Sequence, residues 1–92
     1  MIDINYRIGK KTGSISRIIE KEAIVILPAQ GQVKVLNEVG ARIWELVDGH
    51  KSTSDLIDII CEEYDISREE VEQDTMDFVQ RMLDVQLLEI VA

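Results

Sequence analysis

Three short runs of apolar and β-branched residues follow one another in the first half of the chain. The runs are residues 15–19, 23–27 and 32–36. Their separators are short and include Pro28 and Gly31, which is typical of hairpin turns. The pattern therefore predicts a three-stranded antiparallel meander. The middle run is continuously apolar, as in a central strand, and the third alternates around Lys34, so we expect the third strand at an edge.

From Asn37 onward the apolar spacing changes to that of helices. Asn37 is a favourable N-cap for a first helix that ends at Asp48-Gly49, where glycine would supply a left-handed C-terminal cap. A second helix is expected to start within residues 52–55. The sequence Ser67-Arg68-Glu69-Glu70 is a capping box, in which the two outer side chains bond each other's backbone amides, and it predicts the start of the third and longest helix.

The two ends of the chain give weaker signals. Residues 1–13 are polar and basic with few apolar anchors, and they predict a flexible N-terminal arm. One domain is then expected over residues 14–92, and strands followed by helices place it in the α+β class. Residues 85–91 fit either the fraying end of the third helix or a short extra strand.

The third helix carries an apolar arc formed by Val71, Thr75, Phe78, Val79 and Met82. Met76 and Leu83 extend this arc beyond what one stripe of core requires. Two interpretations follow. Either the helix packs against the other two helices as well as the sheet, or part of the arc forms the floor of an open groove.

The charge of the chain is strongly acidic and unevenly distributed. The formal net charge is −8; residues 1–21 carry five basic and two acidic side chains, a net +3, which leaves −11 for residues 22–92. Because DNA binding draws most of its non-specific affinity from Lys and Arg, this balance argues against a nucleic-acid partner. A simpler interpretation is that the acidic surface keeps a small protein soluble.

The number of cysteines and the length of the apolar segments indicate the cellular compartment of the protein. Cys61 is the only cysteine and forms no intramolecular disulfide, so we expect a reducing, cytoplasmic setting. The N-terminus lacks the apolar segment of a signal peptide, and no stretch reaches the ~18 apolar residues of a membrane span.

Residues suited to catalysis are few. His50 is the single histidine and lies in a turn, and Cys61 lies among apolar residues, where a free cysteine behaves as a small core side chain. One His and one Cys do not complete a zinc site, and the isolated glycines form no phosphate-binding loop. We expect no catalytic residue, no metal and no cofactor.

The edge strand is the remaining candidate site. Its unpaired amides and carbonyls can accept an extended peptide, with side chains supplying specificity. If the third helix lies beside it, the groove would have the helix as one wall and Val33, Lys34, Val35 and Leu36 as the other. The alternative is that Lys34 only protects the edge from aggregation.

Four motifs that follow one another along the chain resemble those of a known family. They are Leu36-Asn37, Trp44-Glu45-Leu46-Val47-Asp48-Gly49, Glu62-Glu63-Tyr64-Asp65, and Val71 with Asp74 and Phe78. Together they resemble the PqqD-like family (coenzyme PQQ synthesis protein D) over about residues 15–88. The resemblance implies a winged-helix-turn-helix-like fold of three strands followed by three helices. It also implies a non-catalytic recognition element that binds the leader of a ribosomally made precursor peptide as an added strand between strand three and helix three, and presents it to a modifying enzyme, often a radical S-adenosylmethionine protein.

The resemblance also supplies a set of expected peptide-binding residues. They are Val33, Lys34, Val35 and Leu36 on the third strand, with Asp74 and Arg81 on one edge of the third helix and Met76 and Leu83 on the other. The sequence does not distinguish these two helix edges. Two positions depart from the family pattern: Thr75 replaces a usual apolar residue, and Gln86 stands where glycine is common.

Two other functions remain open at this point. A winged-helix transcriptional regulator would place the third helix in a DNA groove, but residues 68–84 carry two basic and six acidic side chains, a net −4. A structural or regulatory subunit would instead have its groove filled by a partner or by a second copy, giving a homodimer.

Overall fold

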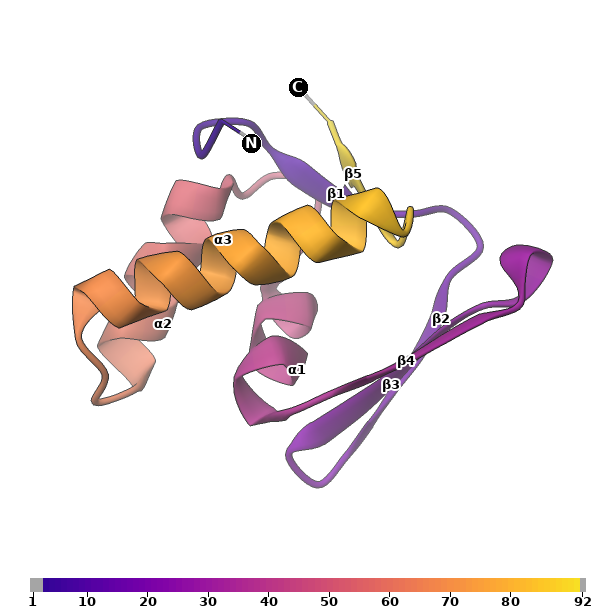
Figure 1. Ribbon diagram of the computed structural model, residues 1–92, viewed down its shortest axis with the longest axis horizontal. Coiled ribbons are helices and arrows are strands. Elements are labelled where there is room, and N and C mark those ends of the chain that lie inside the picture. Colours follow the sequence, from indigo (N-terminus) through magenta and orange to yellow (C-terminus); the bar gives the residue numbers. More distant parts are fainter. Residues whose placement is uncertain (1–2, 92) are drawn as a thin grey trace.

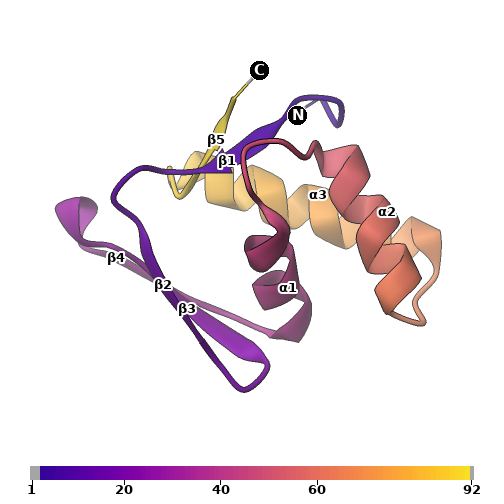
Figure 2. The same ribbon diagram turned by 180° about the vertical axis from the view of Figure 1, so that it is seen from behind.

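The computed structural model describes residues 3–91, and its helices lie on one side of a three-stranded sheet (Figures 1 and 2). The chain order is β1 (Ile8–Lys10), β2 (Ile15–Ile19), β3 (Glu22–Leu27), a 3-10 turn (Pro28–Gln30), β4 (Gln32–Leu36), α1 (Glu38–Leu46), α2 (Thr53–Glu63), α3 (Arg68–Asp84) and β5 (Leu88–Ile90). The predicted α+β class, with three strands followed by three helices, is confirmed.

The sheet is an antiparallel meander in the order β2-β3-β4, as predicted. Ile19 pairs with Glu22, so a tight turn joins β2 to β3, and Glu20 in that turn takes a left-handed φ of 59°. Gly31, with φ of 64°, closes the turn before β4. The central strand buries alternate residues against the helices, and β4 is an edge strand.

Each helix starts at a side-chain cap. Asn37 Oδ1 accepts a hydrogen bond from the Gly40 amide at 2.9 Å, which confirms the predicted cap of α1. The complete capping box lies at α2, where Ser52 Oγ accepts from the Asp55 amide and Asp55 Oδ2 accepts from the Ser52 amide. At α3, Ser67 Oγ accepts from the Glu70 amide at 3.3 Å. The return bond from Glu70 is not formed among the described residues, so the box predicted there is only half present.

The end of α1 differs from the prediction. The helix ends at Leu46, and Val47, in extended conformation, is its C-cap. Gly49 does take a left-handed φ of 85°, but it lies beyond the cap. Its amide donates to the Ile8 carbonyl at 3.0 Å, and the Ile8 amide donates to the Lys51 carbonyl at 3.0 Å. This glycine therefore shapes the loop that holds β1 and does not terminate the helix.

The N-terminal segment is not a loose arm at residues 8–10. These residues form β1, which pairs antiparallel with β5 in the register Ile8 with Ile90 and Lys10 with Leu88. Ile8 is fully buried. A strand of three residues has no local signal of its own, and β1 forms because distant β5 and the loop before α2 satisfy its backbone. The strand interpretation of residues 85–91 is thus the correct one, while residues 1–2 of the predicted arm lie outside the described residues.

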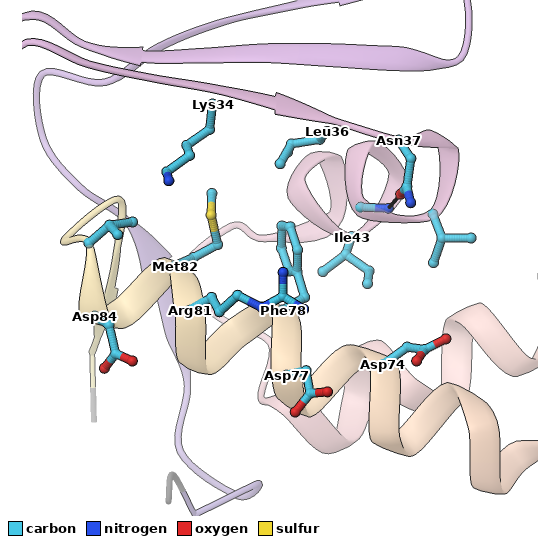
Figure 3. A pocket seen from close by; sticks show the side chains of 13 residues that line it. Lys34, Leu36, Asn37, Ile43, Asp74, Asp77, Phe78, Arg81, Met82 and Asp84 are labelled. Carbon is cyan, nitrogen blue, oxygen red and sulfur yellow. Dashed lines mark hydrogen bonds between the residues drawn. The ribbon is translucent and has the colours of Figure 1, made fainter.

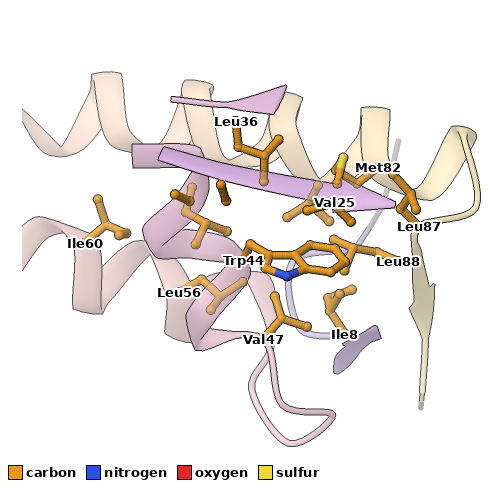
Figure 4. Close-up of a cluster of buried hydrophobic side chains, with 14 of the residues drawn as sticks. Ile8, Val25, Leu36, Trp44, Val47, Leu56, Ile60, Met82, Leu87 and Leu88 are labelled. Atoms are coloured by element: carbon orange, nitrogen blue, oxygen red, sulfur yellow. The ribbon is translucent and has the colours of Figure 1, made fainter. Parts of the chain in front are cut away.

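The core is centred on Trp44, which is 1% exposed and contacts side chains from the sheet, the helices and the β1-β5 ribbon (Figure 4). Lys10 of the ribbon places its Nζ 5.2 Å from the centroid of the Trp44 ring. Burial lowers the pKa of Lys10, and the nearby carboxylates of Glu45 and Asp48 oppose that shift. The ribbon therefore covers the largest core side chain.

Within the described part of the chain, no helix combines the length and the apolar content needed to cross a membrane.

The burial of Ile8 predicts a large effect of Ile8→Ala. The variant is expected to lower the free energy of unfolding by about 2–4 kcal/mol, because it opens a cavity beside a fully buried position. Ile19→Ala is the matched control, since Ile19 is 51% exposed, and its loss should stay below about 1 kcal/mol. Urea unfolding of both variants measures the difference, and equal losses would contradict a structural role of β1.

Thr75 is fully buried in α3, and its hydroxyl has no hydrogen-bond partner within the described residues. Thr75→Val should raise the free energy of unfolding by about 1 kcal/mol, because valine has the same shape without an unsatisfied polar atom. Thr75→Ser keeps the hydroxyl and removes a methyl group, so it should act in the opposite direction. Thermal unfolding monitored by circular dichroism compares the three proteins.

Candidate groove between β4 and α3

A groove of about 530 Å³ lies between β4 and α3, with α1 at its base (Figure 3). Its apolar surface includes Leu36 of β4, Ile43 of α1, and Phe78 and Met82 of α3. Leu36, Ile43 and Met82 are buried, whereas Phe78 is half-buried and stands in the groove. The groove therefore offers an apolar floor with one accessible aromatic ring.

Gly40 allows the Phe78 ring to approach α1 closely. A Cβ atom at this position would lie 3.3 Å from Phe78 Cε1, 3.3 Å from Asn37 Oδ1 and 3.5 Å from Leu36 Cβ. The two contacts at 3.3 Å are tighter than ordinary van der Waals separation, so a larger residue here would move the ring or the cap. A glycine inside a helix is usually unfavourable, and its presence is explained here by close packing at the groove floor.

Charged side chains border the apolar floor. Lys34 extends from β4 toward α3, and Arg81 lies on the facing helix (Figure 3). Neither cation forms an ion pair among the residues the structure describes. Asp74, Asp77 and Asp84 line the α3 side. The groove thus has cations on both walls and acidic groups along the helix.

The backbone of β4 also contributes to the groove, because one edge of this strand is unpaired within residues 3–91. β4 pairs with β3 along one edge, in the register Ile24 with Val35 and Val25 with Lys34. No strand of the described chain pairs with its other edge, which borders the groove. An extended chain placed there would find unpaired amides and carbonyls beside an apolar floor.

Glutamine side chains form hydrogen bonds between the β4 side and the α3 side of the groove. Gln32 Nε2 donates to the Val85 carbonyl, and Gln30 Nε2 donates to Gln86 Oε1 at 3.0 Å. These bonds tie the start of β4 to the end of α3. Gln86 itself takes a left-handed φ of 64°, which explains why glycine is common at this position of the pattern.

The structure brings four of the eight predicted site residues into the groove: Lys34, Leu36, Asp74 and Arg81. Val33 and Val35 lie on β4 but alternate with Lys34 and Leu36, so their side chains are on the opposite face of the sheet and are 60% and 69% exposed. Met76 and Leu83 are half-buried against the core and do not line the groove. The edge of α3 marked by Asp74 and Arg81 is the one that faces β4.

Several groove residues were not among the predicted site residues. They are Asn37, Val39, Gly40, Ile43, Asp77, Phe78, Met82, Asp84 and Val85. Phe78 and Met82 belong to the apolar arc of α3, which was the sequence signal for Met82, and Phe78 also belongs to the motif with Val71 and Asp74. The α1 residues carried none, because their place in the groove depends on how α1 packs between β4 and α3.

The described residues contain no group of three or more His, Cys, Asp or Glu that could hold a metal ion. His50 is exposed, and its amide donates to Asp48 Oδ1 within the loop before α2. Cys61 is a half-buried free thiol packed against the core. Neither residue lines the groove.

Fold and groove together define a small winged-helix-like α+β domain with an open strand edge beside its third helix. Residues 22–88 match the model of the family described as coenzyme PQQ synthesis protein D (PqqD), and the chain belongs to this family.

Two solved structures are similar to this chain. One is TbiB1 in complex with the TbiA(beta) leader peptide, with 32% identity, a TM-score of 0.80 and coverage of 88% of this chain and 94% of that one. The other is lasso peptide synthetase B1 complexed with the leader peptide, with 16% identity, a TM-score of 0.77 and coverage of 90% and 98%. A comparison with curated proteins gave no match.

The left-handed backbone of Gln86 predicts that Gln86→Gly is tolerated or stabilising. Glycine avoids the steric penalty at this φ, and we expect a gain of up to about 1 kcal/mol, reduced by the lost bond to Gln30. Gln30→Ala removes the same side-chain bond, together with the bond that Gln30 Oε1 accepts from Gln32 Nε2 at 3.1 Å, without touching the backbone of Gln86, and serves as the control. Chemical denaturation of both variants separates the effect of the Gln86 backbone conformation from that of the side-chain bond. A clear loss of stability in Gln86→Gly alone would contradict the expected relief of backbone strain.

Proposed function

We propose that this chain binds the leader segment of a ribosomally synthesised precursor peptide as a strand added to β4, and presents it to a modifying enzyme. The observation that carries the proposal is the open edge of β4 beside an apolar groove whose other wall is α3. The added strand would pair with the β4 backbone and place alternate side chains against Leu36, Phe78 and Met82.

The similar structures support this function. Both are described as complexes with a leader peptide, and the one at 32% identity covers most of this chain. The family supports a role in the synthesis of PQQ or of a related modified peptide. A radical S-adenosylmethionine enzyme is the proposed type of modifying partner.

In this proposal the protein is not an enzyme and acts by raising the local concentration of the leader at its enzyme. The groove residues supply an apolar floor and charged walls, without a nucleophile next to a general base. A cytoplasmic location accords with the free thiol of Cys61 and is part of the same proposal. The recognition domain is proposed to span residues 14–92, and β1 adds to its core.

A DNA-binding role is disfavoured by the position of the acidic groups. Asp74, Asp77 and Asp84 lie along α3, the helix that a winged-helix regulator would insert between phosphate backbones.

The test is an amide chemical-shift titration of the labelled protein with the precursor peptide encoded beside its gene. We expect shifts concentrated in residues 32–37 and 68–86, and weaker binding by at least about tenfold in Phe78→Ala, since truncating a central aromatic anchor removes more than about 1.4 kcal/mol. Tyr6→Ala is the matched control, because Tyr6 is an exposed aromatic residue outside the groove.

Three further ligands complete the experiment. A peptide with the same side chains but with N-methylated alternate amides should bind poorly if it pairs as a strand, and a scrambled peptide should not bind. Duplex DNA should leave the spectrum unchanged. Shifts outside the groove, or binding that Phe78→Ala and Tyr6→Ala affect equally, would contradict the proposal.

A further inference from the structure

The helices lie on one side of the sheet (Figures 1 and 2), and the other side carries a second set of apolar side chains. The register aligns Ile15 with Ile26 and Val33, and Arg17 with Ile24 and Val35, so these side chains share one face. We call this face the outer face, and its apolar residues are Ile15, Ile19, Ile24, Ile26, Val33 and Val35. The β3 residues that alternate with them are the buried ones, so the outer face is opposite the core.

The outer face is exposed to an unusual degree for β-branched residues. Ile15 is 58% exposed, and all five residues of β2 are exposed. No part of the described chain covers this face. A contiguous apolar patch on a small protein promotes aggregation unless it serves as an interaction surface.

The position of the face relative to the groove indicates what binds there. β4 contributes Lys34 and Leu36 to the groove and Val33 and Val35 to the outer face. The side chains of a strand added to β4 would also alternate between the groove and the outer face. Every second side chain would then lie next to Val33 and Val35 and extend the outer face. A protein seated on this face would contact the bound peptide as well.

Charge favours a different protein over a second copy. Arg17 lies within the outer face, beside Ile24 in the register, and forms no ion pair in the described part of the chain. Its occupant should therefore carry a carboxylate opposite Arg17. The net charge of −8 opposes pairing of two copies of this chain.

We propose that the outer face of β2, β3 and β4 is the docking surface for the enzyme that modifies the bound peptide, through a flat apolar patch of that enzyme that bears a carboxylate opposite Arg17. This inference rests on the proposed function. It assigns the two sides of β4 to two partners: the peptide on the groove side, and the enzyme on the outer side.

The experiment measures two affinities for each variant: one for the precursor peptide and one for the purified modifying enzyme encoded beside the same gene. Ile15→Glu places a charge on the outer face, two strands away from the β4 edge. We expect it to weaken enzyme binding by at least about tenfold and to leave peptide binding within about twofold. Arg17→Glu keeps the apolar residues and should weaken enzyme binding to a similar degree.

Ser16→Glu is the matched control. Ser16 is on the same strand, is also exposed and receives the same charge, but it shares the opposite face with Val25 and Lys34. Its enzyme affinity should stay within about twofold of the wild type. Circular dichroism establishes that each variant is folded.

The outcomes separate the possible occupants. Equal effects of Ile15→Glu and Ser16→Glu on enzyme binding, or no effect of either, would overturn the proposal. A wild-type dimer in sedimentation that Ile15→Glu dissociates would assign the face to a second copy and would also overturn it. If the wild type binds no peptide, the proposed function fails, and the comparison of Ile15→Glu with Ser16→Glu still decides whether the enzyme docks on this face.

Discussion

β4 is hydrogen-bonded along one edge only, and its side chains alternate between two faces. The open edge of the groove and the separation of the groove from the outer face follow from these two constraints. The free edge provides the backbone groups that an extended chain needs. The alternation sends Lys34 and Leu36 into the groove and Val33 and Val35 to the outer face. A shift of the β3-β4 register by one residue would exchange these two sets, so the hairpin turn that fixes the register also determines which side chains each surface presents.

The core is arranged so that this edge can stay open. A domain of 92 residues buries a modest share of its surface. An open groove beside the sheet leaves apolar side chains partly exposed and so reduces the buried surface further. The ribbon of β1 and β5 compensates, since it adds Ile8 and Leu88 to the core around Trp44 and places Lys10 over the indole ring. Stability is thus concentrated on the helices and the ribbon, while β4 and the exposed side of Phe78 are left available.

The features that could be predicted from the sequence are those with a local cause. Pro28 and Gly31 mark a hairpin, and Asn37, Ser52 and Ser67 cap helices, because turn and cap geometry is set within a few residues. The missed features depend on distant partners. β1 forms only when β5 lies beside it, about 80 positions later in the chain. Likewise the helical period groups Asp74 with Arg81 and Met76 with Leu83, but only the packing of α1 and α2 determines which pair faces β4.

The β1-β5 ribbon has one more consequence. Since Ile8 lies opposite Ile90, the chain enters and leaves the fold at neighbouring points, and none of the ribbon residues lines the groove. A unit with this geometry can be joined to another polypeptide at either end, or inserted as a cassette into a loop of a larger protein, without disturbing the edge of β4. Its two ends can also be linked and new termini introduced elsewhere in the chain, as in a circular permutant. Tethering to an enzyme is therefore compatible with peptide recognition, and the ribbon makes the domain transferable as a module.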